Sequence, residues 1–534
     1  MATSLGNVAV ASRRRRTGSP AHDHVGFPPV LSVTACKSDS MYDDFDRCYR
    51  AVQSKDARFD GWFVTAVLTT RIYCRPSCPV RPPFARNVRF YPTAAAAQAA
   101  GFRACKRCRP DASPGSPEWN VRGDVAARAM RLIADGTVDR DGVTGLADRL
   151  GYTTRQVQRI LQAEVGANPL ALARAQRAQT ARVLIETTDL PFSDVAFAAG
   201  FSSIRQFNDT VRATSACTPT AMRERARRRY GSAETGAGSL ALRLPVRRPF
   251  ACEGVFGHLA ASAVPGVEEF RDGAFRRTLR LSKGHGIVSL TPRDDHVDCV
   301  LHLEDLRDLS SAIARCRRLV DLDADPEAVV DVLSADSELT ALVTKAPGQR
   351  IPRTVDEAEL AGRVVLGQQV SLKAARTHAG RLVAHYGRPI SDPHGGLTHV
   401  FPTVEELADI EPAHLAVPRS RQRTVRALVE ALAAGDVRLD PGCDWDEARQ
   451  QLTALPGIGP WTAEMIAMRG LGDPDAFPVA DLGVLTAARH LGLPDDARAL
   501  AAHSSRWRPW RAYATQHLWT ALDHPVNDWP PKEV

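Results

Sequence analysis

Two short segments rich in glycine, proline and serine divide this chain of 534 residues into blocks that must each build a core of their own. The first runs from Asp111 to Pro117 and the second from Gly231 to Ser239. Such residues favour turns and flexible linkers over helices and strands. At roughly 150 residues per domain, the length itself predicts three to four domains. Hydrophobic residues make up 44% of the chain, which is enough for each block to bury an ordinary core.

The apolar patterns of the blocks differ, and together they predict a multidomain, mainly α protein. We expect a disordered tail at 1–40, a small α/β zinc domain at 41–111, a helical domain with two helix-turn-helix units at 118–230, a small α+β domain at 240–311 and an all-α helix-hairpin-helix domain at 312–534. The tail contains an arginine run but no periodic apolar pattern. In a second interpretation translation starts at Met41, and the tail is never made.

Positive charge is concentrated in the N-terminal half of the chain. Of the net charge of +8, residues 41–111 contribute +7 and 120–231 contribute +6, whereas residues 232–534 are mildly acidic. This pattern predicts binding to a polyanion, although a basic surface that serves only solubility explains the charge equally well. No apolar stretch reaches the ~18 residues that span a bilayer, and no secretory signal is visible. We therefore expect a cytoplasmic protein without membrane contact.

Four of the eleven cysteines form two closely spaced pairs. Three residues separate Cys74 from Cys78, and two separate Cys105 from Cys108. Two such pairs are typical of a tetrahedral zinc site, so Zn²⁺ is the expected cofactor. From the spacing alone, a purely structural site is the favoured interpretation. The other seven cysteines are scattered and are expected to be reduced.

The sequence around the cysteines resembles the N-terminal domain of the Ada-type adaptive-response proteins. The resemblance covers nearly all of 42–111, through Tyr73-Cys-Arg-Pro-Ser-Cys78, Asn87-Val-Arg-Phe-Tyr91 and Ala100-Gly-Phe-Arg-Ala-Cys-Lys-Arg-Cys108. It implies that Cys74 both binds zinc and accepts a methyl group from a DNA methylphosphotriester. Zinc keeps a sulfur as the thiolate that attacks carbon. The transfer is stoichiometric, because the methyl thioether that forms does not readily revert to the thiolate.

Residues 121–230 contain two similar units, each a helix, a glycine turn and a second helix that begins with Ser or Thr. The expected DNA-reading residues on the second helices are Arg155, Gln156, Arg159, Ser203, Arg205 and Gln206. A small helical bundle with solvated arginines is the alternative for one unit alone. The pair resembles the AraC-type DNA-binding domain, through Pro191-Phe-x-Asp-x-Ala-x-x-x-Gly-Phe201 and Thr218-Pro-Thr-Ala-Met-Arg223. The run from Thr210 to Thr214 is less basic than that family usually is, so phosphate contacts there would be weaker.

The segment Leu455-Pro-Gly-Ile-Gly-Pro-Trp-Thr-Ala463 lies between two segments of helical pattern. Gly457 and Gly459 permit a tight turn that directs backbone N–H groups outward at a helix N-terminus. The segment therefore predicts a helix-hairpin-helix, which grips a DNA phosphate without reading sequence. A helix–helix turn that binds no ligand is the alternative.

Asp481 follows the hairpin by about twenty residues, and an isolated Asp before an apolar helix is most often an N-cap. Its spacing resembles that of the helix-hairpin-helix glycosylase superfamily, in which such an Asp is catalytic. The more specific resemblance is to 3-methyladenine DNA glycosylase II of the AlkA type, over most of 240–529. It includes Gly367-Gln-Gln-Val-Ser371, Ala467-Met-Arg-Gly470, Arg506-Trp-Arg-Pro-Trp-Arg-Ala-Tyr-Ala514 and His517-Leu-Trp519.

The AlkA resemblance implies excision of alkylated, cationic purines such as 3-methyladenine. Asp481 would stabilise an oxocarbenium-like sugar after the base has flipped out. Trp461 and Trp519 would form an electron-rich wall for the cationic base, although each could instead be core packing. Related enzymes that also cut the strand have a Lys where Trp461 stands, so we expect a monofunctional glycosylase. Gln369 stands where AlkA-type enzymes can have an apolar wedge that fills the gap left by the flipped base. Met465 stands near a position where an aromatic residue can line their base pocket. These two departures leave the substrate range open.

Together these features predict a bifunctional protein: a repair glycosylase joined to a methyl-accepting, damage-responsive transcription activator. Double-stranded DNA is the expected partner, as damaged DNA and as an operator, and activation adds RNA polymerase. In the main alternative the N-terminal blocks only tether the enzyme to DNA. In a third, the chain is a regulator with a decayed glycosylase, against which the intact Asp481 and hairpin argue. The chain has no Pro-Cys-His-Arg motif, so the alkylguanine methyltransferase of full-length Ada proteins is not expected.

Overall fold

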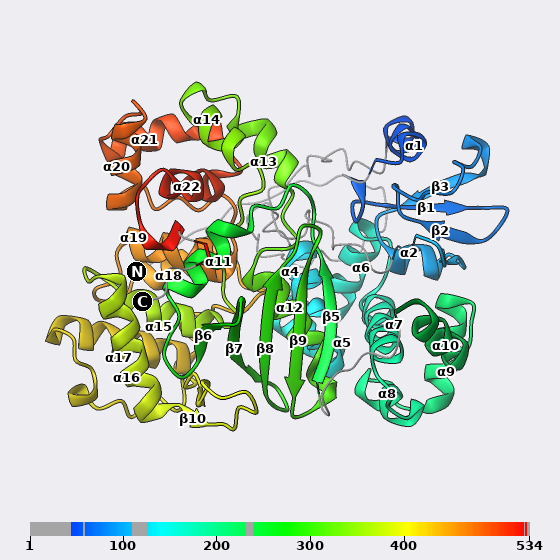
Figure 1. Ribbon diagram of the computed structural model, residues 1–534, viewed down its shortest axis with the longest axis horizontal. Helices are drawn as coiled ribbons and strands as arrows, with labels where there is room; N and C mark the ends of the chain where they lie inside the picture. Colours follow the sequence, from blue (N-terminus) through cyan, green and yellow to red (C-terminus); the bar gives the residue numbers. More distant parts are fainter. Residues whose placement is uncertain are drawn as a thin grey trace, which may run out of the picture. The chain divides into compact units, whose positions relative to one another are not determined.

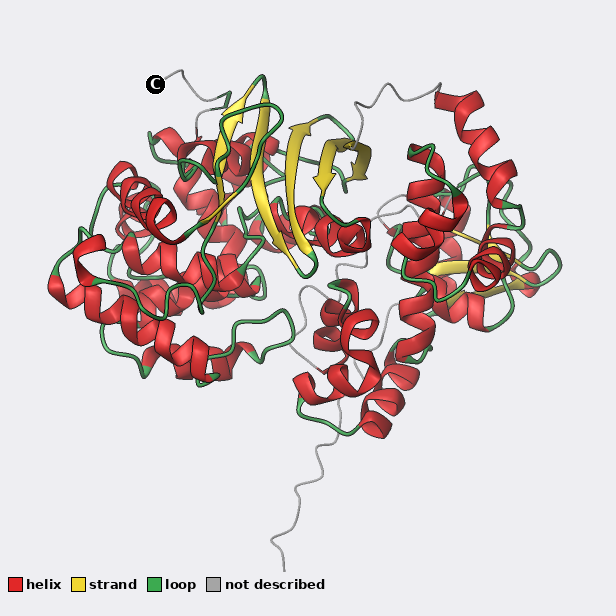
Figure 2. Ribbon diagram, turned by 90° about the horizontal axis from the view of Figure 1, so that it is seen from below, coloured by secondary structure: helices red, strands yellow, loops and turns green. Residues whose placement is uncertain are grey.

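The computed structural model describes residues 44–56, 59–108, 110, 125–230, 239–527 and 529–530. The predicted tail and nearly all of both predicted linkers lie outside these residues. Helices predominate in the described chain, and the strands gather mainly in two sheets (Figures 1 and 2). The expected fold class, multidomain and mainly α, is confirmed. No helix in the described ranges is long and apolar enough to cross a membrane.

A four-stranded sheet with the strand order β3-β1-β2-β4 forms the framework of the first block. Its elements are α1 (Phe45–Ser54), β1 (Val64–Val67), β2 (Ile72–Cys74), β3 (Val88–Tyr91), α2 (Ala94–Ala99) and β4 (Arg103–Ala104). Strand β1 pairs antiparallel with β2 and β3, whereas β2 and β4 run parallel, with Tyr73 opposite Ala104. Because Cys74 ends β2 and Cys105 directly follows β4, the parallel pairing brings one cysteine of each pair to the same end of the sheet.

The second block is helical throughout 125–230, as expected. It contains α4 (Val125–Ala134), α5 (Thr137–Leu150), α6 (Thr154–Glu164), α7 (Pro169–Thr187), α8 (Phe192–Ala198), α9 (Ile204–Ser215) and α10 (Pro219–Tyr230). Helices α5 and α6 form the first unit, and α8 and α9 form the second. The turns contain Gly151 and Gly200, both at positive φ, and Thr153 and Ser203 cap the second helices with their side chains.

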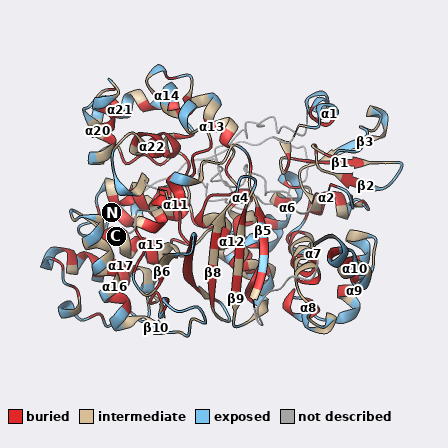
Figure 3. Ribbon diagram, viewed as in Figure 1, coloured by how far each residue is buried: buried red, intermediate tan, exposed pale blue. Residues whose placement is uncertain are grey.

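A five-stranded antiparallel sheet with the order β5-β9-β8-β7-β6 opens the third block. Its elements are β5 (Ser239–Pro245), α11 (Cys252–Ala261), β6 (Glu268–Arg271), β7 (Ala274–Leu281), β8 (Gly284–Pro292) and β9 (His296–Leu303). Residues of β5 and β9 alternate between buried and more exposed, so one face packs on a core, whereas β7 is buried along nearly its whole length (Figure 3). The domain boundary predicted at residue 311 falls inside the next helix, α12 (Leu309–Leu319).

The rest of the chain is almost wholly helical, as predicted, apart from a two-stranded ladder of β10 (Arg388–Pro389) and β11 (His399–Val400). The helices are α13 (Pro326–Leu333), α14 (Ser337–Lys345), α15 (Glu357–Leu366), α16 (Leu372–Tyr386), α17 (Arg419–Ala434), α18 (Trp445–Thr453), α19 (Pro460–Ile466), α20 (Leu482–His490), α21 (Ala497–His503) and α22 (Arg511–Thr520). After α19 the chain continues as a π-helical turn, Ala467–Leu471. One core lies among α15–α19 and a second among α13, α14 and α20–α22, and Trp519 packs against both.

Candidate active sites

A tight turn joins α18 to α19 and carries the two glycines of the predicted hairpin. Gly457 has a φ of +84°, and a Cβ there would lie 2.0 Å from the Thr424 hydroxyl, so only glycine fits. Gly459 is the N-cap of α19 and makes no side-chain cap. Both glycines are exposed, while Ile458 between them is buried and anchors the turn. The first N–H groups of α19 can therefore meet a ligand such as a phosphate.

Three N–H groups converge on the carboxylate of Asp481. The indole Nε1 of Trp519 donates to Oδ1 over 2.9 Å, and that of Trp461 donates to Oδ2 over 3.0 Å. Asp481 is also the N-cap of α20, because Oδ1 accepts the Val484 backbone N–H over 3.0 Å. Gly483 makes room for this arrangement, since a Cβ there would approach Trp519 to 3.2 Å. The N-cap residue and the candidate catalytic residue are thus one and the same.

Apart from the Asp481 carboxylate, both tryptophans pack against apolar cores. Trp461 packs against one helical core, and Trp519 packs against both. His517, on the same helix as Trp519, is fully buried, and burial lowers its pKa to about 4. At neutral pH this histidine is therefore uncharged.

A network of charged side chains braces the hairpin and the segment that leads to Asp481. Arg449 on α18 donates to Glu464 on α19 over 2.8 Å and also pairs with Asp473. The second carboxylate oxygen of Glu464 accepts the backbone N–H of Phe477 over 2.8 Å. Sequence reasoning missed Arg449 and Glu464, because charged residues on helices are common and neither stands in a motif.

The loop between α15 and α16 brings Gln369 to the neighbourhood of the hairpin. Gln369 is exposed and has a φ of +52°, in the left-handed region that few residues other than glycine adopt. Its neighbour Gln368 donates a hydrogen bond to the Gly457 carbonyl. Met465, in contrast, is 8% exposed and packs into the core of α15–α19. Of the two departures from the AlkA pattern, only Gln369 lies at the surface.

Four cysteine sulfurs meet at the end of the small sheet. The Sγ atoms of Cys74, Cys78, Cys105 and Cys108 all lie within 4.8 Å of one another. Zn–S bonds of about 2.3 Å in a tetrahedron place ligand sulfurs about 3.8 Å apart, so the cluster fits Zn²⁺. Cys74 is half-buried, whereas the other three are at most 8% exposed. Taken as whole residues, Cys74 is therefore the most exposed of the four.

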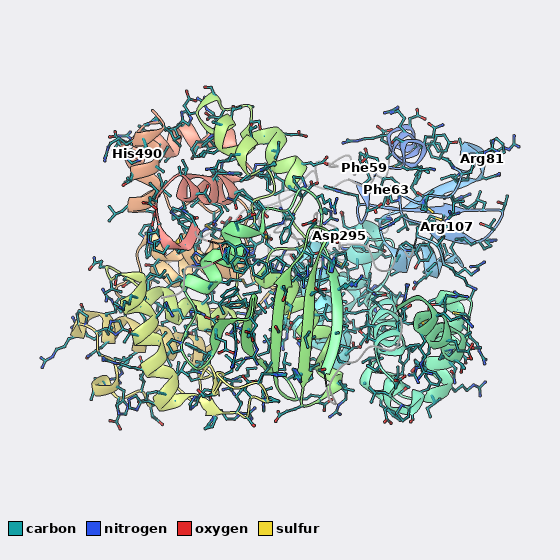
Figure 4. All side chains as sticks on the ribbon, in the orientation of Figure 1. Phe59, Phe63, Arg81, Arg107, Asp295 and His490 are labelled. Atoms are coloured by element: carbon teal, nitrogen blue, oxygen red, sulfur yellow. The ribbon has the colours of Figure 1, made fainter. Side chains whose placement is uncertain are left out.

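Asp60 shapes the turn that joins the first cysteine pair. Its carboxylate accepts the Ser77 backbone N–H over 3.0 Å and the Ser77 hydroxyl over 2.6 Å, and it pairs with Arg75 over 3.3 Å. Burial raises the pKa of Asp60 above its usual value. Sequence reasoning missed this residue, which lies outside the matched motifs. Arg81 and Arg107 (Figure 4) are exposed on the two cysteine-bearing segments.

The six expected DNA-reading residues divide into two groups. Gln156, Ser203 and Gln206 take part in the caps of α6 and α9; the Gln156 amide oxygen, for example, accepts the Thr153 backbone N–H over 3.0 Å. Arg155 and Arg159 are exposed, and within the described part of the chain their side chains make no hydrogen bond or ion pair. Arg205 is exposed as well, and Asp209 lies 3.9 Å away. The arginines are therefore the groups most available to DNA.

Four family models match successive parts of the chain. Residues 47–111 match the metal binding domain of Ada, and residues 146–225 match a helix-turn-helix domain. Residues 241–356 match the AlkA N-terminal domain, and residues 363–512 match the HhH-GPD superfamily of base excision DNA repair proteins. The match to the metal binding domain of Ada and the cluster of four cysteines together establish Zn²⁺ as the cofactor.

One similar protein matches nearly the whole chain, and others match its C-terminal or its N-terminal part alone. The probable bifunctional transcriptional activator/DNA repair enzyme AlkA of Mycobacterium tuberculosis is 75% identical over 493 residues, which is 92% of this chain and 99% of that protein. DNA-3-methyladenine glycosylase 2 of Escherichia coli is 31% identical over 54% of this chain and 97% of its own length. The bifunctional transcriptional activator/DNA repair enzyme Ada of Escherichia coli is 34% identical over 32% of this chain and 48% of its own.

These matches confirm both resemblances expected from the sequence, the Ada type in the N-terminal blocks and the AlkA type in the rest. The relative from Mycobacterium tuberculosis combines them along nearly its full length. The chain therefore belongs to the family of bifunctional transcriptional activators and DNA repair enzymes in which Ada-type domains are joined to an AlkA-type glycosylase.

Proposed function

We propose that this protein removes alkylated purines from DNA, accepts a methyl group from the DNA backbone, and activates transcription in response. The glycosylase activity is supported by the carboxylate of Asp481, which accepts hydrogen bonds from the indole N–H groups of Trp461 and Trp519 beside an exposed hairpin. The observation that carries the methyl transfer is the half-buried Cys74 among three buried cysteines. Both parts act on double-stranded DNA.

Base excision begins when the hairpin at Gly457 and Gly459 holds a DNA phosphate and the alkylated nucleotide turns out of the helix. Gln369 fills the space that the base leaves. An alkylated purine is cationic, so it departs with the electrons of the C1′–N bond and needs little help from an acid. Asp481 faces the positive charge that develops on the sugar and orients the water that adds to C1′.

Each tryptophan serves the reaction with two parts of its side chain. The indole N–H groups of Trp461 and Trp519 hold Asp481, and their ring faces offer electron density to a cationic base. Trp461 cannot form a Schiff base, so the enzyme leaves an abasic site and does not cut the strand. Borohydride should therefore trap no covalent adduct with DNA, and a trapped adduct would show that the strand is cut as well.

Methyl transfer uses Cys74 as the nucleophile. A Zn²⁺ ion held by Cys74, Cys78, Cys105 and Cys108 would keep their sulfurs as thiolates. The Cys74 sulfur attacks the methyl carbon of a phosphotriester, the carbon–oxygen bond breaks, and the phosphodiester leaves as an anion. The product is a thioether, so each chain accepts one methyl group. Exposed Arg81 and Arg107 supply positive charge for the phosphate backbone.

We propose that the helix-turn-helix units read an operator through Arg155, Arg159 and Arg205, and that the bound protein recruits RNA polymerase in the cytoplasm. The caps formed by Gln156, Ser203 and Gln206 set the starts of the two reading helices, and these side chains can also reach DNA there. The alternative is that these units only tether the enzyme. Footprinting on the protein's own promoter separates the two, because a tether protects no defined sequence.

The test of the glycosylase is release of 3-methyladenine from methylated duplex DNA by the purified full-length chain. Repeated turnover is the expected result. A protein that binds the duplex but releases no base would instead support the third interpretation, a regulator without glycosylase activity.

A further inference from the structure

We propose that Gln368 is a positioning residue that sets the distance between the hairpin and Gln369. The inference rests on the proposed function, in which the hairpin holds a phosphate while Gln369 fills the gap in the base stack. The side-chain amide of Gln368 donates to the Gly457 carbonyl over 3.1 Å and to the Thr462 hydroxyl over 2.9 Å. These two bonds join the loop between α15 and α16 directly to the phosphate-binding turn.

The hairpin side of this connection is rigid. Gly457 lies so close to the Thr424 hydroxyl that no Cβ fits between them. Thr462 is 3% exposed, and Ile458 is also 3% exposed. The two acceptors of the Gln368 amide therefore cannot shift without disturbing packed side chains. A donor that bonds to both of them takes its position from the hairpin.

The loop side is short and fixed at both ends. Gly367 closes α15, with its N–H bonded to the Arg363 carbonyl over 2.9 Å. Ser371 caps α16 by accepting the Ala374 N–H over 3.3 Å. Between them Gln369 adopts its left-handed conformation, which a residue with a Cβ keeps only where its surroundings impose it. The two side-chain hydrogen bonds of Gln368 anchor the chain at the residue directly before this conformation.

The spacing matters because both contacts engage one duplex at the same time. If the hairpin fixes a phosphate, Gln369 reaches the base stack only when the loop is correctly placed. A misplacement of about 1 Å near a reacting centre can cost on the order of 100-fold in rate. Loss of the Gln368 amide should therefore slow base release even though Gln368 itself touches neither the base nor the sugar.

The test is a double-mutant cycle in the full-length protein, with single-turnover release of 3-methyladenine as the readout. Gln368→Met keeps the length of the side chain and removes both donors, while Gln369→Ala removes the gap-filling group. We expect each variant to lose about 10- to 100-fold, and the double variant to lose no more than Gln369→Ala alone. A matched control is Gln422→Met, since Gln422 donates to the carbonyls of Leu415 and Val417, both over 3.0 Å, and neither acceptor belongs to the hairpin.

A second readout distinguishes positioning from loss of structure. The wild type should prefer a duplex with an abasic-site analogue over an undamaged duplex, and Gln368→Met should lose this preference while its thermal unfolding matches that of Gln422→Met. Release at the wild-type rate by Gln368→Met or by Gln369→Ala, or losses that multiply in the double variant, would overturn the proposal. Asp481→Asn is assayed in parallel, because wild-type release by that variant overturns the proposed function itself.

Discussion

Each of the two proposed reactive sites of this chain depends on a negatively charged group, a thiolate at the first and a carboxylate at the second. The two sites hold these groups by different means. At the first, four sulfurs within 4.8 Å of one another suit a zinc ion, and Cys74 is the most exposed of the four residues. At the second, the carboxylate oxygens of Asp481 accept hydrogen bonds from the N–H groups of Trp461, Trp519 and the start of α20. In the proposed function, a metal would make the Cys74 sulfur reactive, and methylation would use that sulfur up. Hydrogen bonds would orient the Asp481 carboxylate, which would be unchanged after the reaction and could act again.

The largest expected effect separates the two sites completely. Cys74→Ser should abolish methyl acceptance, because a serine hydroxyl does not become the anion that a zinc-bound cysteine is. Base release should stay at the wild-type rate. Mass spectrometry of the protein after reaction with triester-containing DNA measures the first, and Cys217→Ser, which changes a half-buried cysteine outside the cluster, is the control. A methyl group found on the Cys74→Ser protein would disprove the assignment.

The complementary substitution at the second site is Asp481→Asn, which keeps the shape of the side chain and removes its charge. Base release should fall by about 100-fold or more, while Cys74 still accepts one methyl group. Asp496→Asn is the matched control: Asp496 caps α21 by accepting the Ala499 N–H over 2.9 Å, and Asn caps a helix as well as Asp. Equal rates for the two variants would leave Asp481 as a helix cap only.

A smaller effect tests whether the hydrogen bonds to Asp481 matter as such. Trp461→Phe keeps an aromatic face for the base and loses the N–H that donates to Oδ2. Hydrogen bonds to charged groups contribute about 1.5–3 kcal/mol, so base release should fall by about 10- to 100-fold. If the ring serves only as a wall for the base, Trp461→Phe will release 3-methyladenine nearly as fast as the wild type.

The smallest expected effect is a change in DNA affinity after methylation of Cys74. Four thiolates and Zn²⁺ carry a net charge of −2, and one methyl group reduces it to −1. At ~6 Å from a phosphate and an effective dielectric between 80 and 20, this change is worth roughly 0.7–3 kcal/mol, or about 3- to 100-fold in affinity. Binding to the protein's own promoter should therefore tighten, and less so at high salt. Equal affinity before and after methylation at low salt would rule out the charge switch and leave the transfer intact.

Sequence patterns predicted local features best. Two cysteine pairs predict a zinc site because the metal dictates their spacing, and the glycines around Ile458 predict a tight turn because one of them needs a positive φ. The spacing Thr153-x-x-Gln156 is itself a capping-box pattern, in addition to placing Gln156 on a candidate DNA-reading helix. The cap could thus have been predicted from the sequence.

Contacts between distant residues could not be predicted in the same way. The N–H groups that hold Asp481 come from Trp461 on α19 and Trp519 on α22, and only packing of the two helical cores brings them together. The same is true of the bond from Gln368 to the hairpin and of the turn that Asp60 shapes. In each case the residue type is common, and its role follows from a neighbour far away in the sequence.

The most direct test of the account counts the products of both sites in a single reaction. Wild-type protein is incubated with an excess of methylated duplex DNA, released 3-methyladenine is measured over time, and the protein is then digested for mass spectrometry. The account predicts many bases released per chain, but no more than one methyl group per chain, on Cys74. Base release that stops after one per chain, or a methyl group on another cysteine in place of Cys74, would contradict it.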